Sequence, residues 1–453
     1  MKYSSVNGWK IAPLKEVVDI VKEQFNPQDE PEEEYNYLSI GNIQSNTGRL
    51  IDFTPTKGSE IKSTKLVFTI HDVLYSRLRP NLNKVHIPKF NGICATDLLP
   101  LRPRPLIDRD FLAYYLRTPY VVEYAASRIR GIQLPRLSTN DLLLLPVPVP
   151  PMDIQKKIAS LLSRVCNRAI STREELSRIP ALVRRLRMAI LSRAFQGQLT
   201  NEWRSANMVQ KDLLHILTPD EMLANESDEA LLPSTWIEAR LGKCVEKITK
   251  GESPKWQGFD YVPEGIPFIR SENVLWGYLD LGKAVKIPKA FHQKCKRSQL
   301  VPGDVLINIV GASIGRSCVV PSSIKTANIN QAVALVRVER DLLLPSYLMY
   351  LLISPLVQNT LSKTKVETAR ANISLTHLKQ LVIPIAPISE QFKIVEIIES
   401  RFSAIEKLEL TTTSCLQNIE YLESSVLNSA FSGCFAPTVE DFDKYEQTSI
   451  PDS

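Results

Sequence analysis

The sequence lacks the motifs that nucleotide chemistry requires. Among 453 residues it has 17 glycines, with no G-x-G-x-x-G dinucleotide loop, no G-x-x-x-x-G-K-[ST] phosphate loop and no [DN]-P-P-[YF] methyltransferase tetrapeptide. The nearest match, Gly311 to Ser317, has one residue too few between its glycines and has Arg316 where Lys is needed. We therefore expect no catalytic residues in this chain and interpret that segment as a glycine-rich loop.

Metal sites, disulfides and membrane segments are also not expected. The 7 cysteines are scattered, odd in number and never spaced as C-x-x-C, which is typical of reduced cytosolic thiols. The 5 histidines show no ligand spacing. No apolar core follows Met1, and no run of eighteen apolar residues occurs, so the sequence predicts a cytoplasmic protein.

What the sequence does contain is an internal repeat. Residues 111–200 and 347–436 align without a gap at an offset of 236 (391 − 155), which matches Gln155 with Gln391. Earlier matches are looser, such as Asn42 with Asn273 and Asp72 with Asp304. A drifting offset indicates tolerated insertions, as in binding loops. Each copy therefore has a variable half followed by a fixed half.

The fixed halves carry the spacing of long helices. Apolar residues recur in steps of three and four from Ile154 and again from Ile394, which is typical of a coiled-coil seam. About 42 residues at 1.5 Å each would form a rod of roughly 60 Å. Pro180 should kink or interrupt the first helix.

The two helical stretches have opposite charge. Residues 152–200 have ten basic and three acidic side chains, or +7, while residues 388–438 have three basic and seven acidic, or −4. Two separately solvated faces would explain these charges. Because the stretches also share an apolar seam, we favour two helices that lie against each other.

The predicted fold is α+β, with two globular domains alternating with two long helices that pack as an antiparallel coiled coil in a pseudo-twofold repeat. The boundaries expected are 1–150 and 234–386 for the globular domains, 151–204 and 387–438 for the helices, 205–233 for a linker with a short helix, and 439–453 for a tail. Strands are expected at 65–70, 73–76, 142–151, 305–310, 332–338 and 381–388, and short helices at 111–116 and 347–352.

The loops of the variable halves carry polar and basic side chains. In copy one these are Arg77, Arg79, Asn81, Asn83, Lys84, Arg130, Gln133 and Arg136. In copy two they are Asn308, Ser313, Arg316, Lys363, Lys365, Arg370 and Asn372. Arg and Lys neutralise phosphates, whereas Arg to guanine and Asn or Gln to adenine are bidentate base contacts. Such residues in turns are often structural, but their recurrence in both copies favours contact with nucleic acid.

These passages resemble the specificity subunit of type I restriction-modification enzymes. The resemblance is carried by PVPVPPMDIQKKIASLL (146–162), LRMAILSRAFQGQLTNEWR (186–204), IPIAPISEQFKIVEII (383–398), LESSVLNSAFSG (422–433), NIVGASIGRS (308–317) and ANISLTHLKQLVIPI (371–385). It implies two target-recognition domains, each reading half of a bipartite, asymmetric DNA sequence. Copy one departs from the family because RLRPNLNK (77–84) replaces the glycine-rich loop.

The resemblance also implies that catalysis lies in partners. Two modification subunits would use S-adenosylmethionine to methylate adenine, and restriction subunits would use ATP and Mg²⁺, while this chain would hold no cofactor. The coiled coil would set the spacer between the half-sites and dock the modification subunits. Two alternatives are a non-enzymatic coiled-coil scaffold that binds proteins, whose DNA affinity would not depend on salt, and a fused methyltransferase or nuclease. The target bases cannot be derived from residue types, because DNA shape also contributes.

Overall fold

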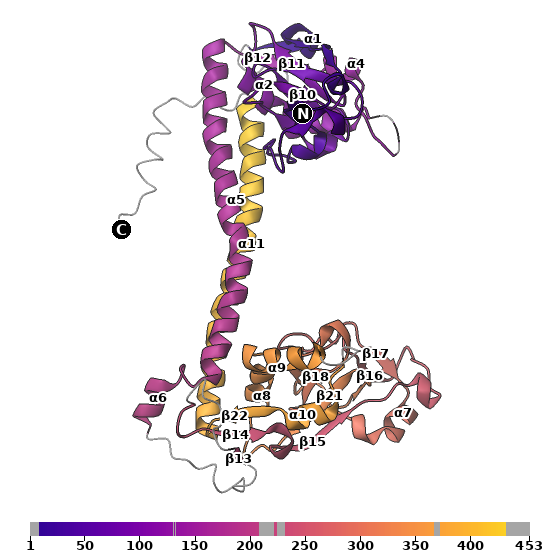
Figure 1. Cartoon of the computed structure of the whole chain (residues 1–453), viewed down its shortest axis with the longest axis vertical. Helices are drawn as coiled ribbons and strands as arrows, with labels where there is room; N and C mark the ends of the chain where they lie inside the picture. Colours follow the sequence, from indigo (N-terminus) through magenta and orange to yellow (C-terminus); the bar gives the residue numbers. More distant parts are fainter. Residues whose placement is uncertain are drawn as a thin grey trace. The chain divides into compact units, whose positions relative to one another are not determined.

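The computed structural model describes residues 9–129, 131, 133–207, 222–223, 232–366 and 372–431 (Figure 1). The chain divides into two compact units, one formed by residues 1–178 with 411–453 and the other by residues 179–410. Each unit contains one globular copy and parts of both long helices. The mixed strands and helices confirm the predicted α+β class.

The first unit opens with short strands that pair into small sheets. Its strands are β1 Lys10–Pro13, β2 Val18–Ile20, β3 Gln24–Phe25, β4 Glu34–Tyr35, β5 Tyr37–Leu38, β6 Thr56–Lys57, β7 Lys65–Phe68, β8 Val73–Ser76, β9 Val85–His86, β10 Gly92–Cys94, β11 Leu98–Pro103 and β12 Pro146–Val149. Its short helices are α1 Leu14–Val17, α2 Arg109–Leu116, α3 Pro119–Ala126 and α4 Thr139–Leu143. The two four-stranded sheets have the orders β3-β7-β10-β5 and β2-β11-β8-β9, and β1 pairs antiparallel with β12.

The second unit repeats this plan. Its strands are β13 Met222–Leu223, β14 Ile237–Arg240, β15 Val245–Lys250, β16 Ile266–Ile269, β17 Val285–Ile287, β18 Val305–Asn308, β19 Ser317–Val319, β20 Asn328–Ile329, β21 Val333–Val338 and β22 Val382–Ile385. Its short helices are α6 Asn201–Ala206, α7 Lys289–Lys294, α8 Pro345–Leu352, α9 Pro355–Val366 and α10 Leu375–Gln380. The sheet β15-β21-β18-β19 matches β2-β11-β8-β9, and the β14–β22 pair matches β1–β12. The predicted duplication is therefore a duplication of topology.

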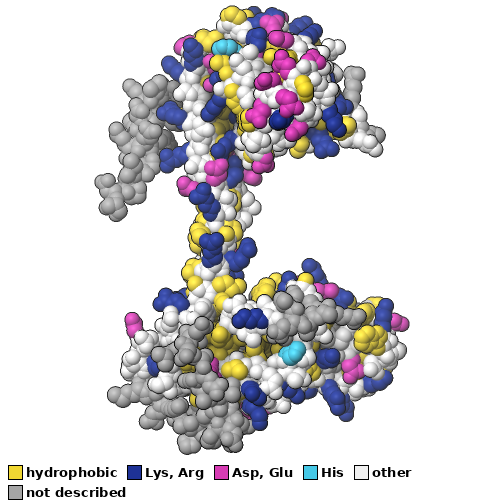
Figure 2. All heavy atoms as spheres, in the orientation of Figure 1, with side chains coloured by type: hydrophobic (Ala, Val, Ile, Leu, Met, Phe, Trp, Pro, Cys, Tyr) yellow, Lys and Arg dark blue, Asp and Glu magenta, His cyan; other side chains and the backbone are white. Residues whose placement is uncertain are grey.

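The long helices are α5, Met152–Phe195, and α11, Ile388–Phe431. In the first unit Arg173 forms an ion pair with Glu423 at 2.5 Å, and in the second Arg187 pairs with Glu409 at 2.8 Å. Since the α11 partner moves back along the chain as α5 advances, the helices are antiparallel. These two ion pairs join basic side chains of α5 to acidic side chains of α11, as the opposite charges of the helices predicted. Separate Lys and Arg side chains also stand on the outer surface of the helix pair, among uncharged surface (Figure 2).

An interruption of the first long helix and the full length of one strand were wrongly expected. Helix α5 runs through Pro180 without interruption, although proline has no N–H to donate to the carbonyl of Leu176. The strand expected over 142–151 begins only at Pro146, because Leu142 and Leu143 close helix α4. Ser138 caps that helix by accepting a hydrogen bond from the Asp141 N–H. Most of the expected linker lies outside the described residues.

Each globular core is completed by the end of the helix from the other copy. Phe431, the last residue of α11, packs against Phe111 and Tyr115 of the first unit, with ring centroids 4.9 and 5.3 Å apart. Phe195, the last residue of α5, packs against Tyr347 of the second unit at 5.2 Å. These phenylalanines are almost fully buried. The matching Ala-Phe pairs of the repeat therefore anchor each helix end to the copy that the helix does not follow.

The repeated glutamine of the QKKI and QFKI segments has a structural role. The buried side chain of Gln155 donates to the carbonyls of Leu106 and Pro150, at 3.0 and 2.8 Å, and accepts from the Asp108 N–H at 2.7 Å. The equivalent partners of Gln391 are Leu342, Ala386 and Leu344, all within 2.9 Å. Buried backbone groups must be hydrogen-bonded, so each glutamine connects a long helix to its globule.

Candidate DNA interface

The two predicted loops of copy one lie side by side. Leu78 forms an antiparallel bridge with Arg136, and the N–H of Leu137 donates to the carbonyl of Arg77 at 2.9 Å. Asp97 strengthens this junction by accepting hydrogen bonds from the guanidinium groups of Arg77 and Arg136, each at 2.9 Å in its shortest contact. Burial favours the neutral form of Asp97, but its bonds with the two arginines outweigh burial and hold its pKa below the usual range.

Copy two brings the equivalent loops together by the same bonds. Val310 forms the antiparallel bridge with Asn372, and the N–H of Ile373 donates to the carbonyl of Ile309 at 2.8 Å. In the glycine-rich loop Gly315 has φ +87° and lies against the Gln358 side chain, where a Cβ atom would come within 2.6 Å. The left-handed backbone conformation therefore favours glycine there, whereas the close contact involves only the end of a flexible side chain.

A third turn, which was not predicted, joins the cluster in copy one. It spans Ile43 to Leu50, which form an antiparallel bridge. The N–H of Asn46 at its tip donates to the carbonyl of Asn83 at 3.0 Å. This turn carries polar residues, QSNTGR (44–49).

The equivalent turn of copy two spans Val274 to Leu279, which also form an antiparallel bridge. The N–H of Gly277 at its tip donates to the carbonyl of Ser317 at 2.9 Å. Sequence carried one signal for these turns, the match of Asn42 with Asn273. Each asparagine opens its turn and donates to a backbone carbonyl at the far end, Asp52 or Asp280, at 3.1 Å. Each candidate interface is therefore a cluster of three loops.

Some predicted residues are engaged within the fold rather than free to bind. Besides Arg77 and Arg136, Asn83 donates to the carbonyl of Arg117 at 2.9 Å, and Lys84 donates to that of Ile40 at 2.8 Å. Burial lowers the pKa of Lys84. Asn308 is fully buried in β18 and donates to the carbonyl of Ser271 at 2.8 Å. These residues position the loops.

Other predicted residues have side chains at least partly open to solvent. Within the described part of the chain, no hydrogen bond or ion pair engages the side chains of Arg79, Asn81, Gln133, Ser313, Arg316, Lys363 and Asn372. Arg79 and Asn83 bracket Pro80–Leu82 with φ +49° each, a strained left-handed conformation. Arg130 and Arg370 lie outside the described residues, and so does the side chain of Lys365. The solvent-facing set contains the donors suited to phosphates and base edges.

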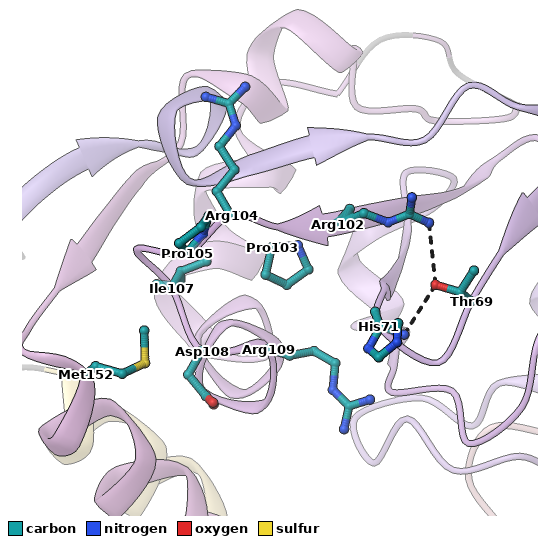
Figure 3. A pocket seen from close by; sticks show the side chains of 10 residues that line it. All are labelled: Thr69, His71, Arg102, Pro103, Arg104, Pro105, Ile107, Asp108, Arg109 and Met152. Carbon is teal, nitrogen blue, oxygen red and sulfur yellow. Dashed lines mark hydrogen bonds between the residues drawn. The ribbon is translucent and has the colours of Figure 1, made fainter.

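A separate pocket of the first unit has a volume of about 680 Å³ (Figure 3). It is lined by Thr69, His71, Arg102, Pro103, Arg104, Pro105, Ile107, Asp108, Arg109 and Met152. Its arginines are engaged: Arg102 with Asp72 at 2.8 Å, Arg104 with Asp19 at 2.6 Å, and Arg109 with Asp110 at 2.9 Å. Because these guanidinium groups are neutralised, we assign no ligand to this pocket.

The described residues place no group of three or more His, Cys, Asp or Glu side chains where they could hold a metal ion. None of the described helices has the length and apolar content needed to cross a membrane.

Comparison with known proteins identifies the family. Residues 7–181 and 233–413 each match the family model of the type I restriction modification DNA specificity domain. The chain belongs to this family. The two matches cover most of the chain and coincide with the two copies of the repeat. They confirm the resemblance inferred from the sequence.

Individual relatives agree with this assignment. The EcoBI specificity subunit of Escherichia coli is 30% identical over 320 residues, which cover 71% of this chain and 65% of that protein. The EcoDI subunit is 30% identical over 201 residues, or 44% of each chain. The chain thus aligns with less than two thirds of these two relatives. The EcoKI specificity subunit of strain K12 is 23% identical over 94% of this chain and 89% of that protein.

Solved structures share the fold. A chain of a type I R-M system, from a study of its complex assembly and conformational transition, has a TM-score of 0.66, 22% identity, and coverage of 94% of this chain and 98% of its own. The HsdS subunit from Thermoanaerobacter tengcongensis has a TM-score of 0.61, 23% identity, and coverage of 94% and 97%. At these identities the likeness concerns the fold alone.

Proposed function

We propose that this chain is the DNA sequence-recognition subunit of a type I restriction-modification complex. Each three-loop cluster reads one half of a bipartite, asymmetric DNA site. The observation that carries the proposal is the recurrence of the cluster, built by equivalent backbone bonds in both copies but carrying different side chains. A common scaffold with different exposed residues suits a protein that reads two unlike sequences.

The mechanism separates positioning from readout. Asp97, Lys84 and Asn308 hold the loops from within, so the solvent-facing side chains enter the groove at little further cost in conformational entropy. Arg79 and Arg316 supply charge for phosphates or guanine, and Asn81, Gln133 and Asn372 supply amides for adenine. In the sequence, the candidate residue Arg130 precedes Gln133, Ser313 precedes Arg316, and Lys363, Lys365 and Arg370 precede Asn372.

Catalysis is assigned to partner subunits. Two modification subunits would supply S-adenosylmethionine-dependent adenine methylation, and restriction subunits would supply the ATP- and Mg²⁺-dependent steps on double-stranded DNA. The scaffold alternative is not favoured, because the relatives are specificity subunits. We further propose residues 1–150 and 234–386 as the target-recognition domains. The β1–β12 and β14–β22 pairs, which join the ends of each globule, support these limits.

The test is single-molecule methylome sequencing of cells that express the chain with its cognate modification subunit. The parent chain should produce a split adenine motif that is absent from cells without it. Arg79→Ala should relax or weaken one half-site and Arg316→Ala the other, with discrimination falling about 5- to 100-fold for a lost base contact.

The control is Arg401→Ala, which removes an exposed charge from α11 and should leave both half-sites unchanged. Absence of any new motif, although the modification subunit is soluble and bound to the chain, would contradict the proposal. So would a single substitution that alters both half-sites equally.

A further inference from the structure

Two large aromatic side chains stand exposed on the third turn of copy two. Trp276 is 49% exposed and Tyr278 is 60% exposed, and they flank Gly277 at the tip. Gly277 has φ +87°, and the space around its Cα is open. Exposed aromatic groups are unfavourable in water and mark binding surfaces when they cluster. The DNA-contacting residues predicted from the sequence include no aromatic side chain and none on this turn.

Hydrogen bonds within the turn and from outside it brace the turn. The Leu275 N–H donates to the Tyr278 carbonyl at 3.0 Å, and the Asp280 N–H donates to the Asn273 carbonyl at 2.8 Å. From outside the turn, the buried Asn308 side chain donates to the Val274 carbonyl at 3.4 Å. The rings are therefore presented by a braced hairpin, and binding orders few additional groups.

The same bonds place the aromatic pair beside the glycine-rich loop. Gly277 donates to the carbonyl of Ser317, the residue after Arg316, while Asn308 begins that loop. The turn that carries the two rings therefore lies beside the loop that carries Arg316, whose guanidinium group has no partner among the described residues. This combination of apolar surface and positive charge suits DNA, where thymine methyl groups and phosphates lie along the same groove.

Copy one supplies the contrast. Its equivalent turn, QSNTGR (44–49), contacts Asn83 in the same way but presents amides and hydroxyls. Arg49 at its far end pairs with Glu174 of α5. The two copies thus share the backbone structure of the turn but differ in its side chains, which are polar in copy one and aromatic in copy two. Such variation is expected where two copies of a scaffold read different bases.

We infer that Trp276 and Tyr278 are specificity-determining residues of copy two, which pack against thymine methyl groups in the major groove of its half-site. This inference rests on the proposed function and adds to it a named base feature. It requires at least one thymine, on either strand, in the half-site that Arg316 reads.

The experiment uses the full chain assembled with its modification subunit, and a duplex that carries the motif named by methylome sequencing. Binding is measured at one fixed salt concentration. Trp276→Ala/Tyr278→Ala should weaken specific binding about tenfold or more and change binding to a scrambled duplex less than twofold. Trp276→Phe/Tyr278→Phe keeps the rings and should restore most of the affinity. Trp256→Ala removes an 80% exposed ring from the same unit and should have no effect.

A second binding measurement replaces thymidine with deoxyuridine, which lacks only the thymine methyl group. Replacing the thymines of this half-site should weaken parent binding several-fold and leave the binding of Trp276→Ala/Tyr278→Ala unchanged. Equal losses in parent and variant, unchanged binding by the alanine variant, or a half-site without thymine would overturn the inference alone. Loss of the modification subunit from the alanine variant would also overturn it, by assigning the turn to a protein interface. A parent complex that methylates no split motif overturns the proposed function together with the inference.

Discussion

Asp97 shows how single residues shape the interface without reaching its surface. Its carboxylate is mostly buried and joins the two loops of copy one through Arg77 and Arg136. Sequence placed both arginines at the interface but had no means of pairing them with a carboxylate 20 and 39 residues away. Basic residues in a DNA-binding loop are often interpreted as DNA contacts. Where a mostly buried carboxylate pairs with them, as Asp97 does here, they stabilise the loop instead.

We predict that Asp97→Ala lowers the free energy of unfolding by about 2 kcal/mol near neutral pH, because it removes charge-assisted hydrogen bonds. The folded-state pKa of Asp97 lies below the value of about 3.9 in an unfolded chain. Its contribution is therefore complete above about pH 5 and is lost as pH falls from there through the folded pKa. Urea unfolding of parent and variant should show a difference that is constant above pH 5 and shrinks towards pH 3.

The matched control is Asp110→Ala, since Asp110 pairs with Arg109 but is 46% exposed. Exposed ion pairs contribute little, so the expected change is below about 1 kcal/mol. A difference between parent and Asp97→Ala that stays constant down to pH 3 would show that the carboxylate charge is not what stabilises the loops.

At the scale of elements, periodicity was a reliable guide where the element was long. Steps of three and four located α5 and α11 closely, because a buried seam constrains every turn of a helix. Short strands were less reliable, as Leu142 and Leu143 show: an apolar run fits a buried strand or a buried helix equally well. Pro180 does not interrupt α5, so a single proline was a poor guide to where a long helix ends.

The aromatic residue at the end of each long helix contributes to the core of the other copy. Phe431→Ala should loosen the first unit, although Phe431 belongs to the helix that follows copy two, because its ring fills the core beside Phe111. A buried Phe→Ala change costs about 3–5 kcal/mol. Hydrogen exchange should accelerate at least tenfold in peptides covering α2, while peptides covering α8 should stay protected.

Phe195→Ala should give the reciprocal result, since Phe195 packs against Tyr347 of α8. Phe392→Ala is the control, because this ring lies on α11 but is 60% exposed. Acceleration in α8 rather than α2 on truncating Phe431 would contradict the assignment of each helix end to the other copy.

For the whole molecule, the central feature is that both long helices contribute to both compact units. Each helix has 44 residues and is therefore about 66 Å long. We propose that this shared helix pair sets the spacer between the half-sites and offers a surface to the modification subunits. Because of the repeat, the same kind of contact between a helix end and a globule occurs twice, once in each unit.

Inserting one heptad into both α5 and α11, at positions that face each other, should lengthen the pair by about 10 Å. At 3.4 Å per base pair this corresponds to roughly three base pairs. Methylome sequencing should return the same two half-sites with a longer spacer. A heptad in α5 alone should mismatch the helices and abolish methylation. An unchanged spacer after the double insertion would contradict the proposal that the helix pair sets the spacer.

The sequence by itself determined the duplication, the alternation of globules and helices, and the family, because these depend on patterns that recur along the chain. It could not show that Asn308 is buried, that Arg77 and Arg136 share one carboxylate, or that the 274–279 turn lies against the glycine-rich loop. These facts depend on residues distant in sequence that meet only after folding. Periodicity records which face of an element is buried, whereas only the tertiary structure decides which polar side chains bond to one another and which remain exposed to solvent.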